Sequence, residues 1–337
     1  MRKVTDFANY LTLFFSAYLA GVRNLSKNTI MAYRDTFRLL LLFCHEVCGI
    51  RPEKLTIAMV EPNLVIRYLD WLQTERNCSV STRNQRLAAV HAFFRYLQAQ
   101  EPEYLFLCQK ILQVPFKKNS KSIIQHLTPE QTTLLLKQPN PKIKTGRRDI
   151  TLLSVLYDTG ARVQEICDLR VRDVRLEHPA LVTLTGKGRK SRHVPLLGNT
   201  VNLLKTYMQE NGMFQNGKQD MPLFYNQQHT ALTRGGITHI LQKYTAELSI
   251  SIPQNVTPHI LRHSKAVHLL KAGVNLLMIR DILGHASIKT TEMYARVDME
   301  TKRKSLESVY PDITPESLPD WNQNKNLLDF FKQPINY

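Results

Sequence analysis

One short strand pattern interrupts a chain whose apolar residues otherwise recur at helical spacing. Residues 181–185 alternate between apolar and polar side chains, residues 186–190 form a glycine-containing basic turn, and residues 191–195 return as a second strand. A lone hairpin cannot bury its own apolar face, so other elements must cover it. The pattern therefore predicts a mainly α fold with a small antiparallel β-sheet.

The helical segments on either side of the hairpin predict two domains. Helices are expected at about 4–19, after the N-cap Ser26, at 62–73 and at 79–98. Further helices are expected at 150–158, 201–211, 234–248, 257–272 and 275–283, and Thr128-Pro129-Glu130-Gln131 is a helix-start signal. We predict a helical domain at 1–114, a basic linker at 115–126, a second domain at 127–310 and a proline-broken tail at 311–337.

The charge of the chain indicates a polyanionic partner. The net charge is +17 with a pI near 9.7, and residues 1–126 hold 17 Lys and Arg against 9 Asp and Glu. The excess is thus shared by both predicted domains, which suggests nucleic acid held from two sides. No apolar run approaches a membrane span of roughly 20 residues, and the N-terminus is read as an amphipathic helix, so we expect a cytoplasmic protein without a membrane partner.

Candidate DNA contacts lie at predicted helix starts and in basic turns. Helix N-termini attract phosphate through free N–H groups and the helix dipole, although the same residues could be simple caps and solvated faces. Lysines of the linker could follow a phosphate backbone. The candidates are Asn28, Thr29, Arg34, Thr82, Arg83, Asn84, Lys117, Lys118, Arg189 and Lys190.

The segment from His259 to Val297 is rich in imidazole and guanidinium groups. His259 and His263 stand four residues apart on a predicted helix, but no carboxylate lies between them and Arg262 would repel a dication. The five cysteines are scattered and fit a reducing compartment. We therefore expect neither a metal site nor a cofactor.

A phosphodiester is the target that best matches these groups. A metal-free site must hold charge on phosphate oxygens, and arginine suits this because its fork stays protonated. Arg162 follows a small-residue turn with Glu165 placed to orient it, and Lys187 sits at the hairpin tip where it could protonate a leaving oxygen. Tyr294 could serve as a nucleophile if cations lie near it.

These residues occur in an order that resembles the tyrosine recombinases, the phage integrase family. The matching motifs are Ala-Arg-Val-Gln-Glu at 161–165, Thr-Gly-Lys-Gly-Arg-Lys at 185–190, His-Ile-Leu-Arg-His-Ser at 259–264, Leu-Gly-His at 283–285 and Thr-Thr-Glu-Met-Tyr at 290–294. The resemblance covers nearly the whole chain and is closest to the short Xer-like members. It implies a SAM-like helical core-binding domain followed by a catalytic domain, together forming a C-shaped clamp on DNA.

The resemblance also implies catalytic roles. Tyr294 would form a 3′-phosphotyrosine, and Lys187 would protonate the leaving 5′-oxygen. His259 would act in proton transfer with the tyrosine, and His285 would bond a non-bridging oxygen. The implied catalytic set is Arg162, Lys187, His259, Arg262, His285 and Tyr294, with neither ATP nor metal required. His263, His268 and Arg280 are expected to have structural or DNA-backbone roles at best.

The family further implies partners and a biological setting. Strand exchange would pass through a Holliday junction in a homotetramer on two DNA sites with inverted-repeat cores, in the cytoplasm on the bacterial nucleoid. The apolar residues near 327–331 would let the tail dock into a neighbouring subunit, with docking in cis as the alternative. Lys265 and Val267 favour recombinases of mobile elements, which act in integration, excision or transposition, and other recombinases of the same element could take part.

Four other interpretations stay open. Chromosome or plasmid dimer resolution would use the same chemistry in a housekeeping role. A DNA-relaxing topoisomerase would need no second site. A DNA-binding or architectural protein with a decayed site is disfavoured by the intact set of six residues, and a metal nuclease is disfavoured because no paired carboxylates accompany the arginines.

Overall fold

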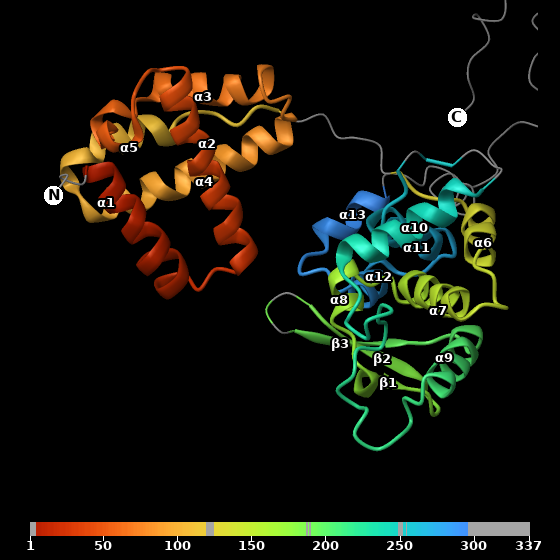
Figure 1. Cartoon of the computed structure of the whole chain (residues 1–337). Coiled ribbons are helices and arrows are strands. Elements are labelled where there is room, and N and C mark those ends of the chain that lie inside the picture. Colours follow the sequence, from red (N-terminus) through yellow and green to blue (C-terminus); the bar gives the residue numbers. More distant parts are fainter. Residues whose placement is uncertain are drawn as a thin grey trace, which may run out of the picture. The chain divides into compact units, whose positions relative to one another are not determined.

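The chain divides into two compact units, residues 1–122 and 123–337 (Figure 1). This computed structural model describes residues 5–118, 125–186, 188, 190–248, 252–253 and 255–295. The described part is mainly helical with one three-stranded antiparallel sheet, which confirms the predicted fold class. The predicted tail at 311–337 lies outside the described residues.

The first unit consists of helices joined by short turns. An N-cap begins three of them, because Thr5, Ser26 and Ser79 each accept a backbone N–H from the first turn. A π-helical stretch, Phe14–Val22, continues the first helix. The helices are α1 (Asp6–Leu13), α2 (Lys27–Glu46), α3 (Pro62–Thr74), α4 (Val80–Gln100) and α5 (Leu105–Leu112).

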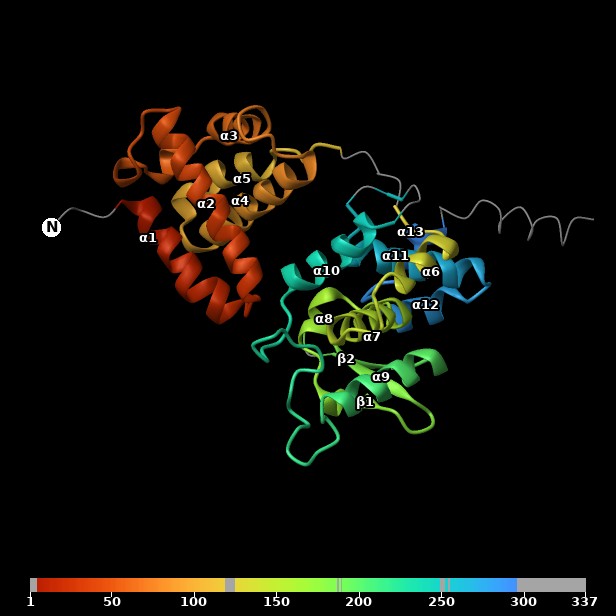
Figure 2. The ribbon, with the colours of Figure 1, turned by 45° about the vertical axis from the view of Figure 1, so that its right-hand side comes forward.

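An aromatic cluster forms the centre of this unit, where α1, α2 and α4 meet (Figure 2). Phe14 is fully buried, and its ring lies edge-on to Phe37 and Phe93 with centroids 6.3 and 5.4 Å apart. Edge-to-face contacts of this kind add to the free energy of burying the rings. Cys44 is buried in the same core, as expected for a thiol without a metal-binding role.

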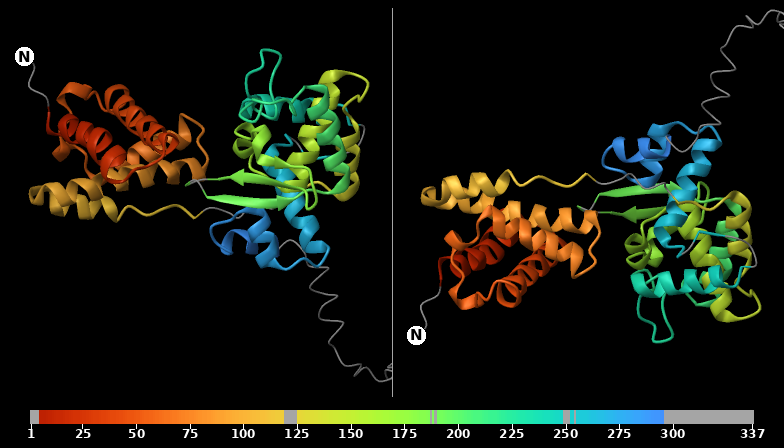
Figure 3. Two further views of the ribbon diagram at one scale, coloured as in Figure 1. Left: turned by 90° about the horizontal axis from the view of Figure 1, so that it is seen from below. Right: turned by 90° about the horizontal axis from the view of Figure 1, so that it is seen from above.

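The second unit surrounds the hairpin with helices. Strand β1 (Val174–Arg175) pairs with β2 (Leu181–Thr185), which pairs with β3 (Ser191–Pro195) in the register Val182 opposite Val194. Both views of Figure 3 show β2 and β3 as the longest strands. The helices are α6 (Pro129–Lys137), α7 (Lys144–Thr159), α8 (Val163–Cys167), α9 (Gly198–Glu210), α10 (Arg234–Ala246), α11 (Pro258–Lys271), α12 (Leu276–Leu283) and α13 (Lys289–Ala295).

Helix α11 fixes the start of this unit through a chain of hydrogen bonds. The Leu127 N–H donates to Ser264 Oγ at 2.8 Å, and the Leu127 carbonyl lies 2.8 Å from Nε2 of His268. The other ring nitrogen of His268 lies 2.8 Å from the Tyr157 hydroxyl on α7. His268 thus has the structural role expected for it. Within the described residues, none of the helices combines the length and the apolar character of a membrane span.

Candidate active site

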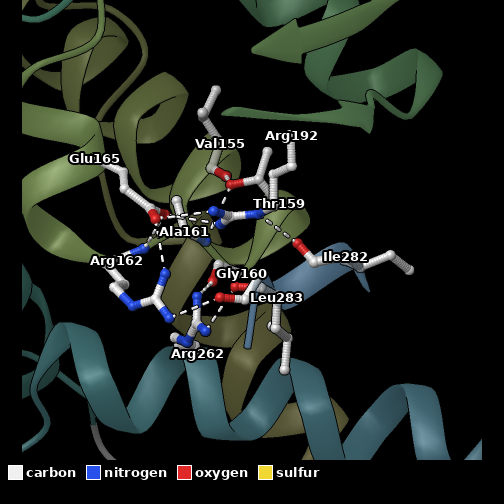
Figure 4. A network of polar contacts seen from close by, with 11 residues as sticks. Val155, Thr159, Gly160, Ala161, Arg162, Glu165, Arg192, Arg262, Ile282 and Leu283 are labelled. Atoms are coloured by element: carbon white, nitrogen blue, oxygen red, sulfur yellow. Dashed lines mark hydrogen bonds and ion pairs between the residues drawn. The ribbon is translucent and has the colours of Figure 1, made fainter. Parts of the chain in front are cut away.

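Three arginines from three different elements donate to the C-terminal end of α12 (Figure 4). The last carbonyls of a helix have no partner within it and carry the negative end of its dipole, so they attract cations. The three bonds are Arg192 Nε to the Ile282 carbonyl at 2.8 Å, Arg262 Nη2 to Leu283 at 2.8 Å and Arg162 Nη2 to Gly284 at 2.9 Å.

Glu165 is the buried counter-charge of this arginine site. Arg192 donates to both of its carboxylate oxygens, at 2.8 and 2.7 Å, and Arg162 adds its Nη1 and its backbone N–H at 2.9 and 2.8 Å. Burial alone would raise the pKa of Glu165, but these hydrogen bonds outweigh it and hold the pKa at about 2. The ionised carboxylate therefore lets two arginines approach each other, and it orients Arg162 as predicted.

Arg262 differs from Arg162 in its exposure. Only 2% of Arg262 is exposed, and its Nη1 donates to the Gly160 carbonyl at 2.5 Å. Burial, and then the charge of Arg162, lower the pKa of Arg262 to about 10, so it stays protonated at neutral pH. The Arg162 side chain keeps 41% of its surface exposed while making its bonds to Glu165 and Gly284. An anion can therefore reach Arg162 most directly.

Tyr294 lies beside this arginine site on α13. It is 1% exposed, and its hydroxyl is 2.7 Å from Nδ1 of His263. Its ring stacks against the ring of His285 with centroids 6.3 Å apart. Burial raises the pKa of Tyr294, while Arg262 opposes this shift. The phenol is therefore protonated at neutral pH, and its O–H can donate to His263.

His263 and His285 are neutral at physiological pH. Burial, followed by the charges of His259 and Arg262, lowers the pKa of His263 to about 4. Burial and three arginines, with Arg262 contributing most, lower the pKa of His285 to about 4. The buried hydroxyl of Thr291 lies 2.9 Å from Nδ1 of His285. When that hydroxyl donates, the proton of His285 resides on Nε2, which can then donate to an anion.

His259 does not contact the phenol directly. The residue as a whole is exposed, but its ring lies edge-on to His263 with centroids 4.3 Å apart and is partly shielded from solvent. Burial of its ring, Arg262 and Arg162 lower the pKa of His259. The family resemblance implies that His259 acts in proton transfer with the tyrosine, whereas His263 is expected to have a structural or DNA-backbone role at best. The i, i+4 spacing of His259 and His263 places both rings on one face of a helix, and this spacing is the sequence signal for their contact.

We expect the second unit to lose stability as the pH falls from about 6.5 to about 4. Within this window, the unfolded chain binds protons on His263 and His285, whereas the folded chain resists doing so because both folded-state pKa values are about 4. Protonation therefore favours unfolding. Urea unfolding followed by circular dichroism at a series of pH values measures the loss of stability.

The matched variant for this measurement is His263→Asn, whose amide can occupy the position of Nδ1 but does not titrate. Its stability should fall less steeply over the same pH range. A pH-independent stability, or an unchanged slope in the variant, would contradict the assignment of neutral histidines.

The other predicted site residues are distributed over both units. Lys187 and Arg189 lie outside the described residues, and Lys190 is exposed beside them, where its carbonyl accepts the Gly186 N–H. Arg192, on the adjoining strand, was not predicted because nothing in a strand sequence indicates a partner as distant as Glu165 or Ile282. Among the described residues, no group of three or more His, Cys, Asp or Glu side chains is arranged to hold a metal.

Some of the predicted DNA contacts have other partners in the first unit. Arg83 is only 4% exposed, so little of its side chain is open to a partner in this structure. Asn84 and Lys117 exchange two hydrogen bonds, side chain to backbone, at 2.8 and 3.1 Å. The Lys117 ammonium also pairs with Asp70 at 3.3 Å. Exposed or partly exposed candidates in this unit are Asn28, Thr29, Arg34, Thr82 and Lys118.

Family models match both units of the chain. The model of the phage integrase family matches residues 125–301, and that of the phage integrase N-terminal SAM-like domain matches residues 14–101. The y4rC protein of Sinorhizobium fredii (strain NGR234), whose name describes it as an integrase/recombinase, is 34% identical over 98% of this chain and 99% of its own. A tyrosine recombinase XerC of Roseiflexus castenholzii is 36% identical over 85% of this chain and 88% of its own.

Two solved structures have a similar fold. XerH recombinase bound to a palindromic difH substrate superposes with a TM-score of 0.65 at 23% identity, covering 85% of this chain and 81% of that one. The integrase of transposon Tn1549 in complex with a circular intermediate DNA gives 0.69 at 19% identity, covering 91% and 100%. At these identities the likeness establishes the fold alone.

Proposed function

The chain belongs to the phage integrase family of tyrosine recombinases, and from this premise we propose that it cuts and rejoins DNA strands through a phosphotyrosine on Tyr294. The observation that carries the proposal is the cluster of Arg162, Arg262 and His285 around a buried tyrosine. These are the groups that a phosphodiester reaction without a metal requires, since they can hold negative charge on phosphate oxygens.

In the proposed first step, Tyr294 Oη forms a bond to phosphorus and the bond from phosphorus to the 5′-oxygen breaks. The phenol proton passes to His263, whose Nδ1 is 2.7 Å away, with His259 as the neighbouring imidazole. The leaving 5′-oxygen takes a proton from Lys187. The products are a 3′-phosphotyrosine and a free 5′-hydroxyl, so no external oxidant or nucleotide is consumed.

The phosphate is held by residues on three elements. The exposed Arg162 donates to one non-bridging oxygen, and Arg262 supplies charge from its buried position. Neutral His285 donates from Nε2, because its Nδ1 is occupied by Thr291. Each of these side chains is fixed before DNA binds, so little reorganisation accompanies the development of charge.

We propose strand exchange as the biological outcome. A second strand whose 5′-hydroxyl attacks the phosphotyrosine reverses the first step, and two such exchanges on two inverted-repeat sites pass through a Holliday junction in a tetramer. Relatives named as integrase/recombinase and as XerC leave two settings, mobile-element integration or transposition and dimer resolution. We favour the first, because Lys265 and Val267 stand where many Xer-type proteins have an aromatic residue and a threonine.

The decisive experiment traps the covalent intermediate. A DNA duplex taken from the inverted repeats beside the gene is nicked near the cleavage point, so that a short strand diffuses away after attack. Incubated in EDTA, the wild-type chain should form an adduct that survives denaturation. Mass spectrometry should locate the nucleotide on the tryptic peptide 290–296, which contains Tyr294. An adduct elsewhere, or cleavage only with a divalent metal, would refute the proposal.

A further inference from the structure

Arg192 makes three hydrogen bonds, none of which the reaction itself requires. It donates twice to Glu165 and once to the Ile282 carbonyl, over distances of 2.7 to 2.8 Å. Its side chain is only 13% exposed, and its nitrogens donate to these protein partners and not to a ligand (Figure 4). Arg192 therefore acts inside the protein.

The partners of Arg192 lead to two parts of the candidate active site. Glu165 orients Arg162, and Ile282 lies three residues before His285 along the end of α12. Arg192 itself belongs to β3, whose partner strand β2 leads directly into the turn that contains Lys187. One guanidinium thus joins the hairpin, the arginine site and the histidine at the end of α12.

Arg192 occupies the space that a side chain at Gly284 would need. Gly284 has a left-handed backbone with φ +65°, and a Cβ placed on it would lie 2.7 Å from Arg192 Nη1 and 2.9 Å from its Cδ. Contacts this short require one of the groups to move. The absence of a side chain at Gly284 therefore allows the arginine to reach between Glu165 and α12.

We propose that Arg192 is a positioning residue that fixes strand β3 and the end of α12 against Glu165, so that Arg162 and His285 meet one phosphate. This rests on the proposed function. Lysine cannot replace Arg192, because a single ammonium lacks the planar fork that bonds both carboxylate oxygens while a third N–H reaches the carbonyl. Loss of the fork should displace the reacting groups without removing any of them.

The same unit contains a matched control. Arg148 donates through two nitrogens to the buried Asp149 and through a third to the Tyr225 carbonyl, and its side chain is 17% exposed. Its bonds resemble those of Arg192 in kind, but none of its partners contacts the arginine site. Arg148→Lys should therefore reproduce the effect on stability without the effect on the reaction.

The test measures the single-turnover cleavage rate at saturating nicked DNA, together with DNA affinity and thermal stability. In Arg192→Lys, the cleavage rate of folded protein should fall about 100-fold, the loss that a misplacement of about 1 Å can cause. The affinity should be unchanged, because the Arg192 side chain is only 13% exposed and its nitrogens donate to Glu165 and Ile282. Arg148→Lys should leave both quantities unchanged. Arg192→Lys cleaving at the wild-type rate would overturn the proposal.

A second readout needs no DNA. In protein labelled with ¹³C-histidine, the ring signals of His285 should shift in Arg192→Lys and stay in place in Arg148→Lys. Unmoved His285 signals in folded Arg192→Lys would also overturn the proposal. If the wild-type chain forms no adduct on any DNA, the proposed function fails, and the His285 signals still decide whether Arg192 positions the end of α12.

Discussion

Replacing Tyr294 with phenylalanine should abolish the covalent adduct on nicked DNA, because the substitution removes the oxygen that would bond to phosphorus and nothing else of the ring. The variant loses one buried hydrogen bond to His263, at a cost of about 1 kcal/mol, so it should remain folded. Its DNA affinity should match that of the wild type. Denaturing electrophoresis of the trapped reaction and a filter-binding titration measure the two quantities.

The control is Tyr157→Phe, which breaks a similar tyrosine–histidine pair whose histidine, His268, lies on the same helix as His263, α11. The Tyr157 hydroxyl lies 2.8 Å from Nδ1 of His268, so this variant also loses one tyrosine–histidine bond. It should lose a comparable free energy of unfolding yet retain the adduct. An adduct that persists in Tyr294→Phe, or disappears in both variants, would show that Tyr294 is not the nucleophile.

Replacing Arg262 with alanine should lower the cleavage rate by about 100- to 1,000-fold, the usual loss when one charge-stabilising donor is removed. The substitution also leaves the carbonyls of Gly160 and Leu283 without this donor in a buried region, at about 1–3 kcal/mol each. Single-turnover cleavage and urea unfolding, measured on the same preparation, separate the two effects.

Two control variants show whether the slower cleavage of Arg262→Ala comes from the lost charge and fork or from lost stability. Arg262→Lys keeps a positive charge but not the fork, so its cleavage rate should lie between those of wild type and Arg262→Ala. Arg148→Ala removes another arginine of the second unit whose side chain is mostly covered, and it should lower stability without slowing cleavage by folded protein. Wild-type cleavage by folded Arg262→Ala would exclude a role of this residue in charge stabilisation.

Local signals in the sequence were sufficient for much of the fold. Ser26, Ser79 and Thr128 marked three helix starts because a cap is a contact between near neighbours. The two long hairpin strands were predicted at their observed bounds from alternation alone. Helix α13 was not predicted, since its polar sequence lacks an apolar period and its buried face depends on Thr291 and Tyr294 packing against other helices.

The parts of the candidate site that lie within one sequence motif could be predicted. The contacts between residues far apart in the sequence could not. The pairing of Arg162 with Glu165 follows from their spacing of three residues. The bond between His263 and Tyr294 spans 31 residues, and the contact of Arg192 with Ile282 spans 90. Contacts across such separations depend on how helices and strands pack, so residue spacing could not indicate them.

Under the proposed function, the burial of Tyr294 would make binding of DNA and cutting of DNA two separate steps. A nucleophile that is 1% exposed in the free chain cannot reach a phosphate until the equilibrium shifts towards an arrangement that exposes it. DNA shifts that equilibrium only by binding the exposed arrangement more tightly than the buried one, and DNA that binds both equally shifts nothing. We therefore expect non-cognate DNA that is held by charge alone to be released uncut, so that discrimination would act at the cutting step as well as at binding.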